Sequence, residues 1–110
     1  MGAEKNFWVY ILLCENNCYY TGYTVDLVKR YRAHVQGRAR CKYTQSFKPV
    51  SLVQCWEIVG SKTLAMQVEY YVKKLSRAAK EKMIAEPMLL QKKFLSHLIK
   101  PACIASITLT

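Results

Sequence analysis

Two apolar segments separated by a polar turn open the chain. Residues 7–14 (FWVYILLC) are continuously apolar and rich in aromatic and β-branched side chains, which is typical of a buried strand. Residues 15–17 (ENN) suit a turn, because asparagine tolerates positive φ. Residues 18–24 (CYYTGYT) predict a second strand, so that the two strands form a β-hairpin. Gly22 inside the second strand indicates a bulge or a close backbone approach.

A helix and a third strand are predicted after the hairpin. The pattern favours a helix over residues 27–35, for which Thr24 and Asp26 offer N-cap oxygens. Residues 38–49 are rich in basic side chains and lack periodicity, so we expect a loop there. Residues 50–59 (VSLVQCWEIV) then predict the third strand.

The second half of the chain is predicted to be helical. Ser61 precedes a helix over residues 62–75, and Ser76 can cap a further helix over residues 77–85. Apolar side chains at helical spacing predict a last helix over residues 88–99. The helix over residues 62–75 has an apolar face made of Leu64, Val68, Tyr71, Val72 and Leu75.

The order of these elements predicts an α+β fold. A hairpin, a helix, a strand and further helices, joined by short connections, favour a small three-stranded, mainly antiparallel sheet flanked by helices. A chain of 110 residues has room for one such domain. Its 52% of hydrophobic residues can form a core without disulfides or a structural metal, and they exclude an intrinsically disordered chain.

The charge balance indicates a polyanionic partner. Seventeen lysines and arginines against seven acidic residues give a formal net charge of +10, which favours binding to nucleic acid or to an anionic membrane surface. On nucleic acid, side chains that neutralise phosphates release counterions and give affinity without sequence preference. A basic surface that only maintains solubility is the alternative.

The cysteine spacing is typical of free thiols. No pair has CxxC spacing, and two histidines are too few to complete the usual zinc clusters. We therefore expect free, buried thiols in a reducing cytosol. The chain also lacks an apolar stretch long enough for a signal peptide or a membrane span, so we expect a cytoplasmic protein with no membrane association. The five cysteines are Cys14, Cys18, Cys41, Cys55 and Cys103.

Two tyrosines and a helical pair are candidates for chemistry. Tyr10 and Tyr20 fall close together if the turn is centred near residue 16, but the face that each takes depends on the strand register. Half-buried core rings are the other interpretation. Arg30 and His34 are four residues apart and share one face of the predicted helix. A solvated surface would show the same pattern.

One carboxylate, Glu69, lies at the edge of an apolar helix face. Its neighbour Val68 belongs to the apolar face, and an ordinary i,i+4 pair with Lys73 is the simplest interpretation of its position. No two carboxylates share an element face near the tyrosines. If Glu69 binds a metal, the sequence therefore favours a one-metal site over a two-metal site.

These segments together resemble the GIY-YIG nuclease superfamily, and most closely its small stand-alone bacterial members. The resemblance covers residues 6–84, and residues 85–110 form a C-terminal extension of unknown role. It rests on WVY at residues 8–10, YTG at residues 20–22, LVKR at residues 27–30 with His34, and Glu69 within AMQVEYYVKK. The first two motifs keep the tyrosine through which the family's chemistry is expected, Tyr10 in WVY and Tyr20 in YTG.

The resemblance implies a metal-dependent DNA endonuclease that hydrolyses phosphodiester bonds and is linked to DNA repair or recombination. In this interpretation Glu69 holds a single Mg²⁺ or Mn²⁺, and Arg30 neutralises the scissile phosphate. Tyr10 acts as a general base on the attacking water or orients it. Tyr20 orients water or phosphate, and His34 relays a proton or hydrogen-bonds the phosphate.

The basic segment 38–49 is the candidate for binding the DNA backbone, through Lys42, Tyr43 and Lys48. Backbone contacts carry no sequence information, so we expect selection of branched, nicked or flapped DNA, or help from a partner protein. The main alternative is a non-catalytic nucleic-acid-binding module with the same fold. A peripheral membrane protein is less favoured, because the basic residues are spread through the chain instead of lying on one amphipathic helix.

Overall fold

The structure, a computed structural model, describes residues 5–39 and 41–102. Within that part of the chain, four strands form one sheet in the order β2-β1-β3-β4, and each neighbouring pair is antiparallel. β2 and β4 are therefore the edge strands. The strands are β1 (Asn6–Cys14), β2 (Tyr19–Thr24), β3 (Pro49–Val59) and β4 (Ile99–Pro101).

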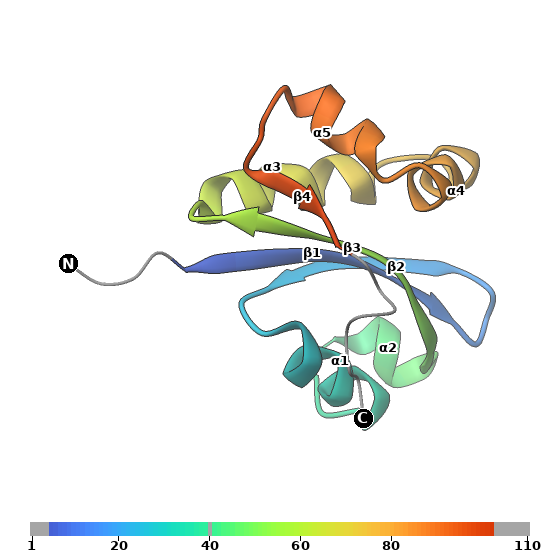
Figure 1. The fold of residues 1–110 in the computed structure, drawn as a ribbon. Coiled ribbons are helices and arrows are strands. Elements are labelled where there is room, and N and C mark those ends of the chain that lie inside the picture. Colours follow the sequence, from blue (N-terminus) through green and yellow to red (C-terminus); the bar gives the residue numbers. More distant parts are fainter. Residues whose placement is uncertain (1–4, 40, 103–110) are drawn as a thin grey trace.

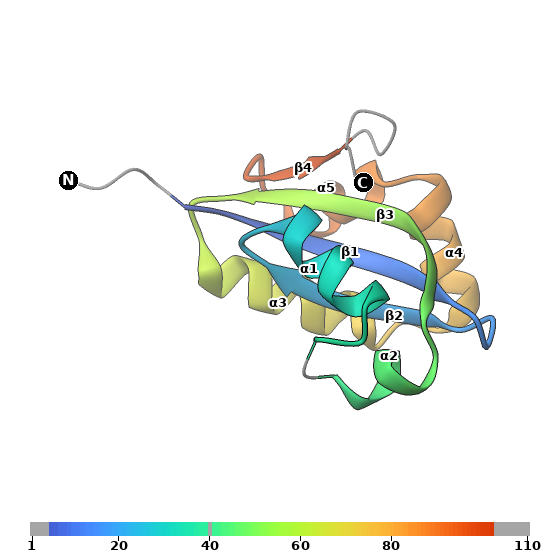
Figure 2. The ribbon, with the colours of Figure 1, turned by 90° about the horizontal axis from the view of Figure 1, so that it is seen from below.

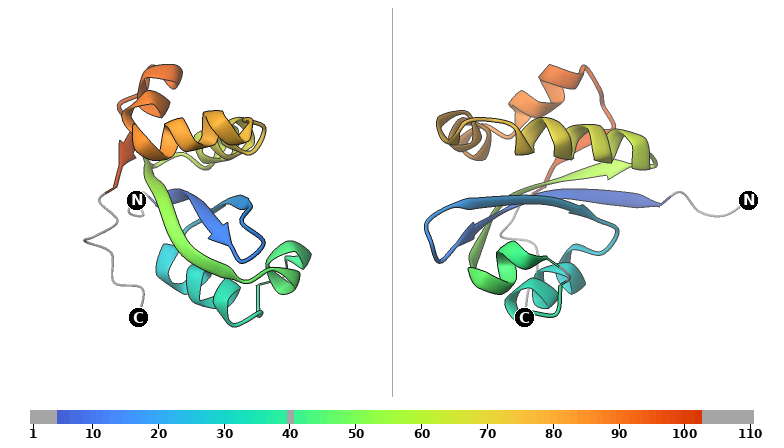
Figure 3. Two further views of the ribbon diagram at one scale, coloured as in Figure 1. Left: turned by 90° about the vertical axis from the view of Figure 1, so that its right-hand side faces the viewer. Right: turned by 180° about the vertical axis from the view of Figure 1, so that it is seen from behind.

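Helices cover both faces of the sheet. On one face lie α1 (Leu27–Val35) and α2 (Lys42–Ser46), and on the other lie α3 (Lys62–Lys73), α4 (Arg77–Ala85) and α5 (Met88–Phe94) (Figures 1 and 3). From below the sheet, α1 is seen lying across it, with α2 beside the start of β3 (Figure 2).

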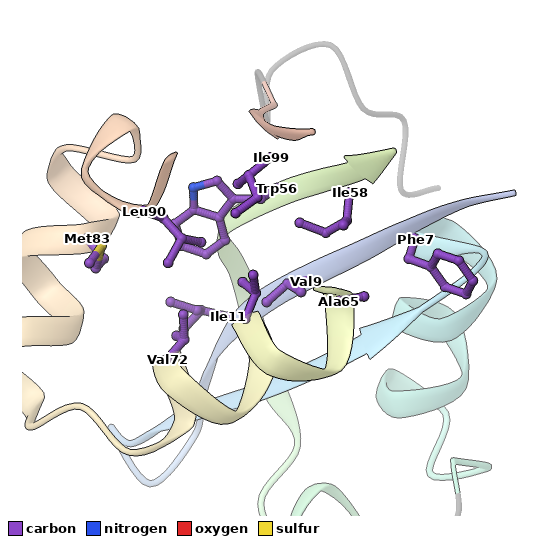
Figure 4. Close-up of a cluster of buried hydrophobic side chains, with 11 residues drawn as sticks. Phe7, Val9, Ile11, Trp56, Ile58, Ala65, Val72, Met83, Leu90 and Ile99 are labelled. Atoms are coloured by element: carbon purple, nitrogen blue, oxygen red, sulfur yellow. The ribbon is translucent and has the colours of Figure 1, made fainter. Parts of the chain in front are cut away.

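Strand alternation divides the apolar side chains between the two faces. Alternate residues of β1, Val9 and Ile11 among them, pack with Val68 and Val72 of α3 and with Trp56 of β3 (Figure 4). The indole Nε1 of Trp56 donates a hydrogen bond of 2.9 Å to the carbonyl oxygen of Pro87. The other set of β1 residues faces α1 and packs with Leu27, Leu52 and Cys55; it consists of Tyr10, Leu12 and Cys14.

The α+β class, the antiparallel hairpin and the helix starts are confirmed. Asp26 caps α1 by accepting a hydrogen bond from the backbone N–H of Lys29, and Ser61 caps α3 in the same way through Leu64. Gly22 does mark a close approach. It lies opposite Tyr10 in the β1–β2 pairing, and a Cβ at this position would lie 2.5 Å from the Tyr10 hydroxyl oxygen.

Three details of the sequence prediction are wrong. The segment predicted as a loop contains the one-turn helix α2. The last helix ends at Phe94 and not near residue 99, because Leu95 takes a left-handed conformation with φ 50°. The chain then returns to the sheet as β4, where Ile99 pairs with Ile58, so the sheet has four strands and not three.

The C-terminal extension contributes to the same core as far as the structure describes it. Leu90 of α5 and Ile99 of β4 are fully buried and belong to the cluster formed by α3 and the sheet. Residues 103–110 of the extension, Cys103 included, lie outside the described residues. The other four cysteines are free, as expected, but only Cys14 and Cys55 are buried; Cys18 is exposed and Cys41 is half-buried.

None of the helices in the described part of the chain has the length and apolar character needed to cross a membrane.

Candidate active site

The Tyr10 ring lies across the edge strand β2. Because Tyr10 pairs with Gly22, the tyrosine ring occupies the space that a side chain at Gly22 would take. The close approach brings the Tyr10 hydroxyl from the central strand β1 to the edge of the sheet. The residue itself is 1% exposed, and its hydroxyl oxygen lies 2.9 Å from Nε2 of His34.

Tyr20 lies on the same face as Tyr10, so the strand register brings the two predicted tyrosines together. Their ring centroids are 6.4 Å apart, and the Tyr20 ring also meets the edge of the His34 imidazole at 5.2 Å. Burial raises the pKa of Tyr20 above its ordinary value. Tyr20 therefore keeps its proton at neutral pH and can donate or accept a hydrogen bond.

His34 is a fully buried, neutral imidazole with both nitrogens hydrogen-bonded. The Thr44 hydroxyl donates to the carbonyl oxygen of Cys41 at 3.4 Å, and Nδ1 of His34 lies 2.8 Å from the Thr44 Oγ1. In this arrangement Nδ1 carries the proton and Nε2 accepts from the Tyr10 hydroxyl. Burial and, to a smaller extent, the charge of Arg30 lower the pKa of His34 to about 4.

Arg30 is half-buried one helical turn before His34 and interacts electrostatically with both tyrosines. Burial alone would lower the pKa of Arg30, but the hydroxyl of Tyr10 and, next, that of Tyr20 raise it overall. In turn, burial raises the pKa of Tyr10, and the neighbouring guanidinium offsets only part of that rise. The site therefore combines a permanent cation with protonated phenols.

Glu69 lies on α3, on the opposite face of the sheet from Arg30 and His34 of α1 (Figure 1). Burial is the main cause of the raised pKa of Tyr10, and the negative charge of Glu69 makes a small contribution to it. The Glu69 side chain is half-buried, and no ion pair joins it to Lys73 in the described part of the chain.

The carboxylate of Glu69 is the one protein group here that suits a divalent cation. Within residues 5–39 and 41–102, no three histidine, cysteine or acidic side chains are clustered so that they could hold a metal. A site for Zn²⁺ or Ca²⁺ built wholly from protein ligands therefore does not fit these residues. A Mg²⁺, or Mn²⁺ in its place, does fit, since Mg²⁺ is often bound through one carboxylate, with water and phosphate as the remaining ligands.

The residues predicted to bind DNA lie at the same end of the molecule in different settings. Lys42, the first residue of α2, and Lys48, two positions after its end, are both exposed. Tyr43 is instead half-buried, with its ring stacked on Tyr20 at 6.0 Å and its hydroxyl accepting a hydrogen bond from Asn16 Nδ2 at 2.9 Å. Tyr43 thus forms part of the wall of the tyrosine site.

The sequence reasoning missed Thr44 and Cys41. Thr44 is 1% exposed and fixes the orientation of the His34 ring, but nothing in a basic, non-periodic segment distinguishes its hydroxyl from others. Burial alone would raise the pKa of the Cys41 thiol, but hydrogen bonds from the Thr44 backbone and the Tyr20 hydroxyl lower it overall. The only hint in the sequence was that Cys41 and Thr44 lie three positions apart, and this hint was weak.

Comparison with known proteins gives consistent matches. A family model described as the GIY-YIG catalytic domain matches residues 6–82. The UPF0213 protein YazA of Bacillus subtilis is 44% identical over 82 residues, which are 74% of this chain and 81% of that protein. A UPF0213 protein of Natronomonas pharaonis is 43% identical over 79 residues, which are 72% of this chain and 91% of that protein.

A solved structure is also similar to this chain. The solution NMR structure of a UPF0213 protein from Bacillus halodurans is 41% identical, with a TM-score of 0.48, and the match covers 80% of this chain and 95% of that one.

Proposed function

Because the chain belongs to the GIY-YIG catalytic-domain family and to the UPF0213 family, we propose that it is a metal-dependent DNA endonuclease. It hydrolyses phosphodiester bonds, selects its substrate by DNA structure, and acts in DNA repair or recombination. One observation carries the proposal. The buried hydroxyl of Tyr10 lies 2.9 Å from the neutral imidazole of His34, and the charges of Arg30 and Glu69 both affect its pKa.

Arg30 is the group that neutralises the scissile phosphate. Its planar guanidinium is always charged and can donate to two phosphate oxygens at once. In the absence of substrate it hydrogen-bonds the Tyr10 hydroxyl and interacts electrostatically with Tyr20. The negative charge that develops on the phosphate in the transition state strengthens its interactions.

Tyr10 and His34 form a proton relay for the attacking water. The water gives its proton to the Tyr10 oxygen while the Tyr10 hydroxyl gives its own proton to Nε2 of His34, so a free phenolate is never required. Burial and, to a smaller extent, the charge of Arg30 lower the pKa of His34, and a phosphate bound to Arg30 neutralises that charge. Substrate binding thus makes the imidazole a better proton acceptor at the time it is needed.

Glu69 would hold a Mg²⁺ or Mn²⁺ ion, and the ion would supply charge stabilisation for the phosphate and the leaving oxygen. Tyr20, which remains protonated, orients a phosphate oxygen or the water by hydrogen bonding. The exposed Lys42 and Lys48 contact the DNA backbone outside the reacting centre, where they add affinity without sequence preference.

The test is nicking of supercoiled plasmid with Mg²⁺ or Mn²⁺ and with EDTA. We expect metal-dependent nicking by the wild-type protein and none by Glu69→Ala. The matched control Glu86→Ala, an exposed carboxylate at the end of α4, should nick like wild type. All three should shift labelled DNA in EDTA with similar affinity. DNA binding by the wild-type protein without cleavage in either metal would instead identify a non-catalytic binding module.

A further inference from the structure

A groove at the edge of β2 lies beside the tyrosine site and has no role in the relay. It has a volume of about 400 Å³ and is lined by Tyr19, Tyr20 and Thr21 of β2, by Cys41 and Tyr43 from the α2 side, and by Lys73 and Lys80 from α3 and α4. The groove therefore joins the helices on the two faces of the sheet around the edge strand.

The two lysines give the groove a cationic wall. Lys73 is exposed and Lys80 half-buried, and they come from two different helices. In the parts of the chain that the structure describes, neither ammonium group lies within 4.0 Å of a carboxylate oxygen. Two cations from separate elements that converge without a counterion suit an anionic ligand, and phosphate is the anion that the neighbouring site requires.

The opposite wall is aromatic. The Tyr43 ring lies nearly parallel to that of Tyr20, with an interplanar angle of 18°. Thr21 lines the groove on the lysine side, because it pairs with Ile11, whose side chain packs against α3. It is 3% exposed, and its hydroxyl has no hydrogen-bond partner among the described residues. A buried hydroxyl without a partner is costly unless a ligand completes its hydrogen bonding.

The size of the groove selects among phosphate ligands. A volume of about 400 Å³ is within the ordinary range for a pocket that takes a small molecule, so it can take one nucleotide but not a stacked base pair. Aromatic rings bind an unpaired base by stacking, whatever its sequence, whereas a base inside a duplex is already stacked on its neighbours.

We propose that the β2-edge groove is a subsite for one unpaired nucleotide that directly flanks the scissile phosphate. Lys73 and Lys80 bind its phosphate groups, and the Tyr43 ring faces its base. The groove shares Tyr20 with the catalytic site, so a strand held at Arg30 continues into it. The flanking position rests on the proposed nuclease function, and it explains how contacts with the backbone and one unpaired base would select flapped or branched DNA.

The experiment measures affinity in EDTA, where cleavage plays no part. A short fluorescein-labelled DNA strand is used alone, annealed to its complement, and as that duplex with an unpaired tail, with dissociation constants from fluorescence anisotropy over a salt series. We expect the strand and the tailed duplex to bind wild type about tenfold more tightly than the blunt duplex, in line with the stacking of one base.

The variant Lys73→Gln/Lys80→Gln should lose most of that preference, and its salt slope on the single strand should fall by about 1.4, which corresponds to two phosphate contacts. The matched control Lys92→Gln/Lys100→Gln removes the same charge at α5 and β4, toward the opposite edge of the sheet, and should keep the preference. Tyr43→Leu should reduce the preference while the salt slope remains unchanged. Circular dichroism confirms that each variant is folded.

Equal affinity for the strand and the blunt duplex, or equal losses in the two lysine pairs, would overturn the proposal. Its failure is separable from failure of the nuclease function. A preference for unpaired DNA in a protein that never cleaves would leave the subsite standing, and metal-dependent cleavage without such a preference would remove the subsite alone.

Discussion

Gly22→Ala is the change whose effect follows most directly from the packing of the candidate site. An alanine Cβ would lie 2.5 Å from the Tyr10 hydroxyl oxygen and 2.7 Å from the ring carbon that bears it. Ordinary contacts begin at 3.4 Å, so the difference from 2.5 Å requires a movement of 0.9 Å. The Tyr10 ring is 1% exposed and has no open side to move toward.

Two costs follow from that displacement. Overpacking of a buried ring destabilises a protein by about 1–3 kcal/mol. Loss of the 2.9 Å hydrogen bond to Tyr10 leaves the buried Nε2 of His34 without a partner, at a further cost of about 1–3 kcal/mol. A Gly→Ala change at an unobstructed position would instead stabilise by about 0.4–1 kcal/mol, so the two outcomes differ in sign.

Urea unfolding and cleavage kinetics test both parts of this prediction. We expect Gly22→Ala to lower the free energy of unfolding by about 2–6 kcal/mol and the cleavage rate by about 10²-fold, the size of effect that a displacement near 1 Å has on a catalytic group. Tyr10→Phe is the reference, because it removes the hydrogen bond without the steric clash and should destabilise less. A Gly22→Ala protein as stable and as active as wild type would refute the placement of the Tyr10 ring.

Three further predictions concern charge, pH and the core. Arg30→Ala should lower kcat by about 10²–10³-fold, and Arg30→Lys should restore only part of it, because a lysine cannot replace the planar fork; equal activity of Arg30→Ala and wild type would contradict the role. Since His34 has a pKa of about 4 in the folded protein and 6.5 as a free side chain, only the unfolded state binds its proton between these values. The free energy of unfolding should therefore fall as pH decreases from 6.5 to 4, by up to about 3 kcal/mol. This fall should be reduced in His34→Gln, and the same pH slope in both proteins would show that His34 is not buried neutral. Ile99→Ala should cost about 2–5 kcal/mol in chemical denaturation, since this side chain of the C-terminal extension is fully buried; a loss below about 1 kcal/mol would mean that β4 is dispensable.

The local elements were predictable because each has a signal within its own segment. The hairpin follows from an apolar run, a turn and a glycine, and α1 and α3 follow from Asp26 and Ser61 placed before helical patterns. β4 was not predictable in this way. It is three residues long, and its only reason to be extended is pairing with β3, some forty positions earlier in the chain.

The candidate site, too, was predictable from the sequence only in part. Spacing places Arg30 and His34 on one helix face, but whether Tyr10 and Tyr20 share a sheet face depends on the register of the hairpin. Thr44 could not be selected at all, because its importance comes from a contact with a ring ten residues away. Glu69 was identified through the family resemblance, since a carboxylate one step from an apolar stripe is ordinary by itself.

The central claim is that Glu69 holds one divalent cation beside Tyr10 and Tyr20, and paramagnetic broadening by Mn²⁺ tests it most directly. Substoichiometric Mn²⁺ is added to ¹⁵N-labelled protein, and amide signals are compared between wild type and Glu69→Gln. The account predicts strong broadening in wild type around these three residues, none around Ile99 at the far edge of the sheet, and loss of the effect in the variant. Broadening centred elsewhere, or unchanged by Glu69→Gln, would contradict it.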